Sequence, residues 1–274
     1  MLMRILGYGI SLLLAGPAWG ATDAATVESL MRKSGMWEQL EQIAPQVQAG
    51  IAAGAARSGQ RPSEAESERL SRAIDHAYAA QRLRAACRAT ISRNLDRTHV
   101  EALRRWYDSG SGRRISSLER AQSAQDGQAA LRRGAVLLGE MSASRRRALE
   151  ELVVVSRSAE LQTELTIGTA LAVHQGAASV SPEAARPSLG EIKATLDKQR
   201  HGMTRAFSAL SLASFAVAYA SLSPAELEAY VDFLKSDAGR HYNSVTMRAF
   251  GTAMLDAAAE LGRAAPGSKD KAHT

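Results

Sequence analysis

The sequence has little of the material that disulfide-linked or sheet-based folds require. It contains one cysteine, Cys87, in 274 residues, so no intramolecular disulfide can form and the fold must depend on its apolar core. Aromatic residues make up 5% of the chain, and no segment alternates apolar and polar residues, which excludes a protein built mainly of strands. After the N-terminal segment 1–20, no apolar run in the sequence is long enough to cross a bilayer.

The sequence also lacks the motifs of the common catalytic and metal sites. It has no Gly-x-Ser-x-Gly nucleophile elbow and no Gly-x-x-x-x-Gly-Lys phosphate loop. Cys87 lies between Leu83 and Ile91 in a helical pattern without a nearby histidine, so we interpret it as a core residue. No His-Glu-x-x-His or His-x-x-x-His pair occurs among the histidines, which are His76, His99, His174, His201, His241 and His273. We therefore predict no catalytic residues, no metal and no cofactor.

Alanine and helical periodicity are what the sequence has in quantity. Apolar residues recur at three- and four-residue steps in two stripes, which places each stripe on one face of a helix. The stripes are Met36, Leu40, Ile43, Val47 and Ile51, and Ile192, Leu196, Met203, Phe207, Leu210 and Val217. We expect Pro45 to kink or break the helix that carries the first stripe.

Helix start signals agree with this periodicity. Ser188–Glu191 and Ser223–Glu226 both fit a capping box, and Pro224 stands at the first helical position of the second. We predict an all-α protein, a helical bundle with helices over 23–34, 36–56, 63–94, 97–109, 111–138, 143–157, 159–179, 189–221, 224–236 and 238–262.

The first twenty residues are typical of a secretory signal peptide. Arg4 supplies the positive charge, Ile5–Ala15 forms the apolar run, and Ala18–Gly20 places small residues where a signal peptidase acts. A membrane anchor is the alternative, but the run is shorter than the ~20 residues that a span requires. We predict cleavage after Gly20, export to the periplasm and no transmembrane helix in the mature chain.

One motif occurs twice in the chain. The hexapeptides SGSGRR and SDAGRH each follow an aromatic residue at the end of a helical stretch, Trp106 in one case and Phe233 in the other. We interpret each as a structural elbow, in which a serine ends one helix and a glycine lets the backbone turn tightly. An anion site at the start of the next helix is the alternative. The elbow residues are Ser109, Gly112, Ser236 and Gly239.

The repetition extends beyond the elbows. Asp96–Ser117 aligns with Ser223–Ser244, and further upstream Val27–Ser34 aligns with Leu149–Ser156. We therefore predict two tandem repeats of about five helices each, which could form an internal pseudo-dimer. The predicted segments are a signal peptide at 1–20, a first helical repeat at 21–141, a second helical repeat at 142–262 and a disordered tail at 263–274.

This layout resembles a known family. The segment LSPAELEAYVDFLKSDAGRHY (Leu222–Tyr242) is similar to the bacterial exported family called domain of unknown function 2059, in which a Tyr/Phe-x-Ser-x-x-Gly-basic step follows a helix capped by Ser-x-x-Glu. The resemblance covers roughly Leu189–Leu255 and, more loosely, Leu70–Ala121, and here Leu234 and Lys235 precede the serine. It implies an all-α fold, export to the periplasm and no assigned activity, and it provides no catalytic residues.

Arginine is concentrated between Arg82 and Arg114, where nine arginines stand against three acids, Asp96, Glu101 and Asp108. One interpretation is a solvated helix surface; the other is contact with an anionic partner. That partner would be an envelope protein, a lipid headgroup or a glycan, and nucleic acid is not expected for an exported chain. The candidate partner-binding residues are Arg82, Arg84, Arg88, Arg93, Arg97, Arg104 and Arg105.

Two functional hypotheses follow from the sequence, with a weaker third. The first is a non-catalytic interaction or adaptor module of the cell envelope. The second is an enzyme acting on an envelope polymer or small ligand, with a cleft between the repeats; a single glutamate, Glu101 or Glu228, would then act as the acid. The third is peripheral membrane binding through amphipathic helices, for which the chain has few aromatic anchors.

Overall fold

The computed structural model describes residues 22–57, 59, 63–123, 127–180 and 187–264. In these residues the chain forms helices and connecting turns without a strand, so the all-α prediction is confirmed. None of the described helices is long and apolar enough to span a membrane. The predicted signal peptide 1–20 lies outside the described residues, as does the tail after Ala264.

The helices are α1 (Ala24–Lys33), α2 (Met36–Gln39), α3 (Ile43–Arg57), α4 (Glu64–Ala77), α5 (Ala80–Asn94), the 3-10 helix η1 (Arg97–His99), α6 (Val100–Asp108), α7 (Gly110–Ser123), α8 (Gly127–Glu140), α9 (Ala143–Ser156), α10 (Ser158–Val180), α11 (Leu189–Ala218), α12 (Pro224–Lys235) and α13 (Asp237–Ala264).

The helices begin where the sequence signals predict. Ser188 and Ser223 each accept a hydrogen bond from the backbone N–H of the glutamate three residues later, at 3.2 and 3.3 Å. That glutamate accepts a hydrogen bond from the backbone N–H of the same serine, so both predicted capping boxes are present. A third box, at Ser63, starts α4.

Three helices expected to be continuous are interrupted. The predicted helix 36–56 is divided between α2 and α3, and Pro45 lies in the first turn of α3, where its missing N–H removes no helical hydrogen bond. The predicted helix 63–94 stops at Ala77 and resumes at Ala80, because the chain turns at Tyr78 and buries its ring in the core. The predicted helix 111–138 is divided between α7 and α8 around residues 124–126, which are outside the described residues.

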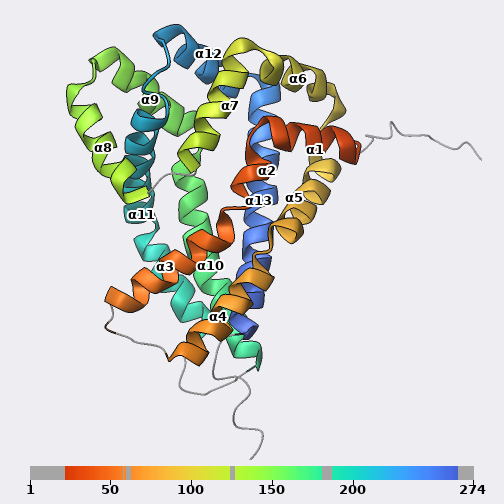
Figure 1. The fold of residues 1–274 in the computed structure, drawn as a ribbon, viewed down its shortest axis with the longest axis vertical. Coiled ribbons are helices and arrows are strands. Elements are labelled where there is room, and N and C mark those ends of the chain that lie inside the picture. Colours follow the sequence, from red (N-terminus) through yellow and green to blue (C-terminus); the bar gives the residue numbers. More distant parts are fainter. Residues whose placement is uncertain (1–21, 58, 60–62, 124–126, 181–186, 265–274) are drawn as a thin grey trace, which may run out of the picture.

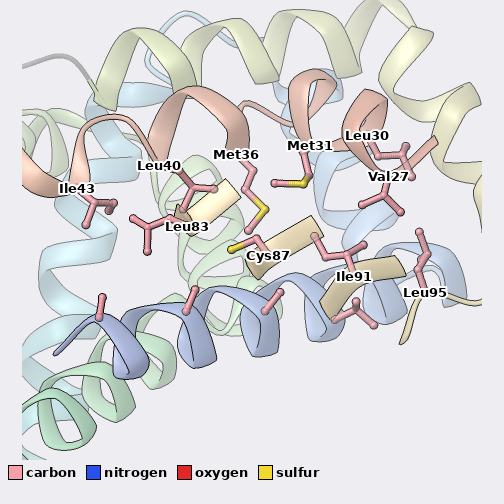
Figure 2. Packing of buried hydrophobic residues seen from close by; sticks show 14 of the residues in the cluster. Val27, Leu30, Met31, Met36, Leu40, Ile43, Leu83, Cys87, Ile91 and Leu95 are labelled. Carbon is pink, nitrogen blue, oxygen red and sulfur yellow. The ribbon is translucent and has the colours of Figure 1, made fainter. Parts of the chain in front are cut away.

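The described helices enclose two apolar cores. In Figure 2, side chains of α1 and α2 point toward Leu83, Cys87 and Ile91 of α5, and α13 closes the same core. The first core is formed by Val27, Leu30, Met31, Met36, Leu40, Ile43, Ile74, Ala77, Tyr78, Leu83, Cys87, Ile91, Leu95 and Leu103 with Ala238, Tyr242, Val245, Ala249, Ala253, Ala257 and Leu261 of α13. The second core is formed by Ile115, Leu149, Leu152, Ala216, Tyr219, Leu222, Leu227, Val231 and Leu234.

Two helices cross between the predicted repeats. Helix α13 belongs to the segment 142–262, yet it packs against α4 and α5 in the first core. Helix α7 belongs to 21–141, yet its Ile115 is part of the second core. In Figure 1, α7 and α13 run between α1, α5 and α6 on one side and α8 and α9 on the other. The two segments are therefore interlocked and do not form separate globules.

The two elbows have the same geometry. Ser109 and Ser236 are both extended, with φ −70° and ψ 162° in one and φ −66° and ψ 158° in the other. Each hydroxyl donates to the carbonyl of the aromatic residue three positions earlier, Trp106 or Phe233, at 2.6 Å. Each serine oxygen also accepts the N–H of the glycine three positions later, at 3.0 Å. The serine thus ends one helix and caps the next.

The glycine of each elbow serves close packing. Among the described glycines, only Gly35 and Gly59 have a positive φ, so Gly112 and Gly239 do not supply a left-handed turn. A Cβ at Gly112 would lie 2.0 Å from the carbonyl oxygen of Trp106, and one at Gly239 would lie 1.9 Å from that of Phe233. Only a residue without a side chain allows the two helices to meet at this distance.

We expect Gly239→Ala to lower the free energy of unfolding by about 1–3 kcal/mol, because the added methyl group overlaps a backbone carbonyl that cannot move independently. Gly251→Ala is the matched control on the same helix, since no atom lies within 4 Å of its added Cβ. The control should gain about 0.5–1 kcal/mol from helix propensity. Urea unfolding measures both, and equal effects of the two substitutions would contradict the close approach.

Candidate functional site

Most of the seven candidate arginines are engaged within the molecule. Their contacts are Arg82 with Glu260 (2.8 and 2.6 Å), Arg84 with the carbonyl of Trp37 (2.8 Å) and with Glu41 (3.0 Å), Arg88 with Glu28 (3.0 Å), and Arg104 with Thr26 (3.0 Å). The side chain of Arg93 donates to Ala89 on its own helix, and the side chains of Arg97 and Arg105 have no hydrogen bond or ion pair to a described residue. These arginines therefore join helices more than they form a separate basic surface.

The other candidates from the sequence are not gathered in one cavity. Glu228 lines a pocket between α9 and α12, Ser109 and Ser236 line a second at the elbows, and Gly239 lines a third. Glu101 and Glu228 are exposed on α6 and α12. At the elbows, Arg113 and Arg240 donate back to the carbonyls of Asp108 and Lys235, so their guanidinium groups are already engaged. Cys87 is fully buried, which raises its thiol pKa to about 12 and leaves it unreactive. Within the described ranges, no three His, Cys, Asp or Glu side chains form a metal-binding group.

A cavity of about 290 Å³ lies beside Trp106 and Phe233, the aromatic residues that precede the two elbows. Its walls come from helices of both predicted repeats, chiefly α6, α7, α12 and α13. The main apolar lining residues are Trp106, Ile115, Phe233, Leu234, Met247 and Phe250. The main polar lining residues are Ser34, Tyr107, Glu119, Tyr230, Tyr242 and Thr246. A mostly apolar space with a few converging polar groups is the usual form of a small-molecule site.

Stacked aromatic rings form one wall of this cavity. Trp106 and Phe233 lie face to face, with ring centroids 4.3 Å apart and planes within 4°. Tyr230 is nearly parallel to Trp106 at 6.0 Å, and Tyr107 meets Phe233 edge-on at the same distance. Trp106 and Phe233 are the two residues that precede the elbows, so the aligned positions of the sequence contact each other directly.

Glu119 is the carboxyl group of the cavity. It projects from α7, and the hydroxyls of Tyr219 and Tyr230 each donate to its Oε1 at 2.7 Å. Burial raises the pKa of Glu119, while the two tyrosine hydrogen bonds and the charge of Arg120 partly offset that shift. Glu119 is not among the residues predicted from the sequence, and no local motif marks it, because its partners come from α12 and from the end of α11.

Tyrosine hydroxyls continue from the carboxyl group around the cavity. Tyr242 lies 3.4 Å from the hydroxyl of Ser34, which itself contacts the carbonyl of Met31 at 3.2 Å. Burial raises the pKa of Tyr107 and of Tyr230 well above the usual value, and that of Tyr242 to about 12. The hydroxyls therefore stay neutral near pH 7 and act as hydrogen-bonding groups.

Comparisons with family models, with curated proteins and with solved structures find no match for this chain. The resemblance to domain of unknown function 2059 therefore stays a prediction.

The arrangement can hold a ligand by charge and shape. Glu119 is the one carboxyl among the described lining residues, and they include no cysteine, histidine or lysine that could act as nucleophile or base beside it. Its two tyrosine partners donate hydrogen bonds to the carboxyl and hold it in place. A held carboxyl beside aromatic rings can select a ligand by charge and shape.

Glu119→Gln should change how stability depends on pH. Because the folded pKa of Glu119 is raised, the folded state keeps its proton in a pH range where the unfolded state releases it. Wild-type stability therefore falls as pH rises from the ordinary glutamate range through the raised value. Glutamine cannot ionise, so the variant does not lose stability in this way as the pH rises.

Urea unfolding between about pH 4 and pH 8 measures this effect as the difference in unfolding free energy between variant and wild type, which should rise with pH. Glu101→Gln, which removes an exposed carboxyl on α6, controls for the loss of one charge. A variant-minus-wild-type difference that stays constant with pH would mean that Glu119 is not held in a desolvating site.

Proposed function

We propose that this chain is a non-catalytic helical binding module of the periplasm, which holds a small ligand in the cavity around Glu119. The observation that carries the proposal is a carboxyl fixed by two tyrosine hydroxyls inside a cavity of about 290 Å³. An enzyme with a cleft between the repeats was the alternative from the sequence. The described lining residues include no histidine, lysine or cysteine beside Glu119 to activate a hydroxyl or attack a substrate, which favours binding.

We also propose that the module arose by duplication of one helical unit and is an internal pseudo-dimer. The matching elbows support this, as does the direct stacking of the aligned residues Trp106 and Phe233. In a pseudo-two-fold arrangement, a contact between two positions recurs between their aligned counterparts. His99 contacts His241 at 4.8 Å, and the aligned pair, Glu226 and Arg114, forms an ion pair at 3.2 Å.

A second pair of aligned contacts supports the same proposal. The backbone N–H and hydroxyl of Thr22, before α1, donate to the carbonyls of Ser92 and Leu95 at 3.0 and 2.9 Å. The side chain of Arg145, in the first turn of α9, donates to the carbonyls of Tyr219 and Leu222, which are the aligned positions. The same two carbonyls at the end of a helix are thus satisfied by different donors in the two predicted repeats.

Export is proposed on the basis of the N-terminal sequence, whose charged, apolar and small-residue regions have the order of a secretory signal. Contact of the arginine-rich surface with an acidic envelope partner is less favoured. Five of its seven side chains already donate to neighbouring residues, and charges that are paired internally contribute little to a partner.

A cavity-filling variant tests the proposed ligand site. Thr246 lines the cavity, and its hydroxyl bonds only to carbonyls of its own helix, so Thr246→Phe adds bulk without removing a contact between helices. Thr252→Phe, at an exposed position of the same helix, is the matched control. The proteins are purified from the periplasmic fraction, where the proposal expects an N-terminus at Ala21.

A small-molecule extract of the periplasm should raise the melting temperature of the wild type and of Thr252→Phe, but not that of Thr246→Phe, because a ligand stabilises only the state that binds it. An unchanged melting temperature in all three proteins would contradict the proposal. A shift shared by all three would place the ligand outside the cavity.

A further inference from the structure

The hydrogen-bond donors around the cavity are largely used within the protein. Tyr219 and Tyr230 donate to Glu119. The hydroxyl of Ser34 donates to the carbonyl of Met31, so the hydrogen between Ser34 and Tyr242 comes from Tyr242.

Two further polar side chains of the lining also donate within the protein, while Gln39, Ser116 and Tyr107 line the cavity as well. Thr246 donates to the carbonyl of Tyr242 at 2.9 Å, and the amide nitrogen of Asn243 donates to the carbonyl of Ser156 at 3.1 Å. Their oxygens keep free lone pairs. Glu119, Asn243 and Thr246 therefore present hydrogen-bond acceptors, which favours a ligand that brings donors.

The carboxyl group of Glu119 also favours a ligand that brings hydrogen-bond donors. Both tyrosine hydrogen bonds go to Oε1 of Glu119, and within the described residues no donor reaches Oε2. No arginine, lysine or histidine belongs to the described lining, and the charge of Arg120, which partly lowers the pKa of Glu119, acts from outside that lining. A carboxyl without a cation on its open side is complementary to a positively charged group.

The remaining walls require an apolar partner. The cavity is also lined by the apolar side chains of Trp106, Ile115, Phe233, Met247 and Phe250. A volume of about 290 Å³ admits an aromatic ring or a short alkyl chain. A polyol or a small inorganic cation would leave these side chains without a partner.

We infer that the ligand is an amine with an aromatic or short alkyl group, whose ammonium donates to Oε2 of Glu119 while its hydrocarbon part lies against the aromatic wall. This inference rests on the proposed function, since it names the ligand class of the same cavity.

Binding of such an amine depends on pH. The groups that face Glu119 are Tyr107 of α6, Arg120 of α7, Tyr219 after α11, Tyr230 of α12 and Tyr242 of α13. The tyrosines stay neutral and arginine stays charged near pH 7. The carboxyl is thus the group that titrates, and the affinity for an ammonium rises as the pH rises through its raised pKa.

Isothermal titration calorimetry with three probes of one shape tests the inference. Phenethylamine, 2-phenylethanol and phenylacetate share a ring and differ in charge. The wild type should bind the amine about tenfold or more tightly than the alcohol, as one charge-assisted hydrogen bond provides, and should bind the acid more weakly still.

Glu119→Gln keeps an oxygen that accepts from both tyrosines and removes the charge. It should lower the amine affinity at least about tenfold, toward that of the alcohol, whereas Glu101→Gln should change neither affinity. If Glu119→Gln does not fold, the same titrations of the wild type at several pH values test the inference. The affinity for the amine should rise between about pH 5 and pH 8, while the affinity for the alcohol stays constant.

The amine inference would be overturned if the alcohol or the acid bound as tightly as the amine. If Thr246→Phe then abolished all of this binding, the cavity would still be the ligand site. No binding of the amine would also overturn the inference, and the melting-temperature experiment would then decide the proposed function separately. Amine binding that Thr246→Phe does not affect would contradict both.

Discussion

The stack of Trp106 on Phe233 is the contact on which the rest of the structure depends. The rings lie 4.3 Å apart and join α6 to α12. Each ring is followed at once by an elbow, in which a serine ends the helix and a glycine lets the next one start against the carbonyl of the ring residue. Because the rings meet face to face, the two elbows lie close together, and α7 and α13 both begin there. Helix α13 of the segment 142–262 then packs into the first core, and α7 of the segment 21–141 packs into the second core.

This crossing explains why the two halves are interdependent. The first core is closed by the row of small side chains on α13, and the second core takes Ile115 from α7. The cavity lies beside the stack because helices of both halves converge there without filling the space. Glu119 shows this convergence, since it lies on α7 of the first half and accepts hydrogen bonds from Tyr219 and Tyr230 of the second half. The position of this carboxyl is thus a consequence of how the halves interlock.

Local sequence signals were sufficient for the helices and for the alignment of the two elbows. Capping boxes at Ser188 and Ser223 depend only on neighbouring residues, so they could be predicted. The break at Tyr78 could not, because no glycine or proline marks it and the burial of the ring decides it. Glu119 was also missed, because the aligned residue in the other half is Thr246 and the tyrosines that hold the carboxyl come from distant helices. The elbow glycines were predicted as turn residues, whereas the structure uses them for close approach of two helices.

A double-mutant cycle on the stacked rings tests whether Trp106 and Phe233 join the two halves of the protein. Trp106→Ala, Phe233→Ala and the double variant are unfolded in urea, and a parallel cycle pairs Trp106→Ala with Phe207→Ala on α11, where no described ring contact joins the two residues. The account predicts a coupling of about 0.5–1.5 kcal/mol between Trp106 and Phe233 and additive effects in the parallel cycle. Additive effects in both cycles would show that the halves are not joined through these rings.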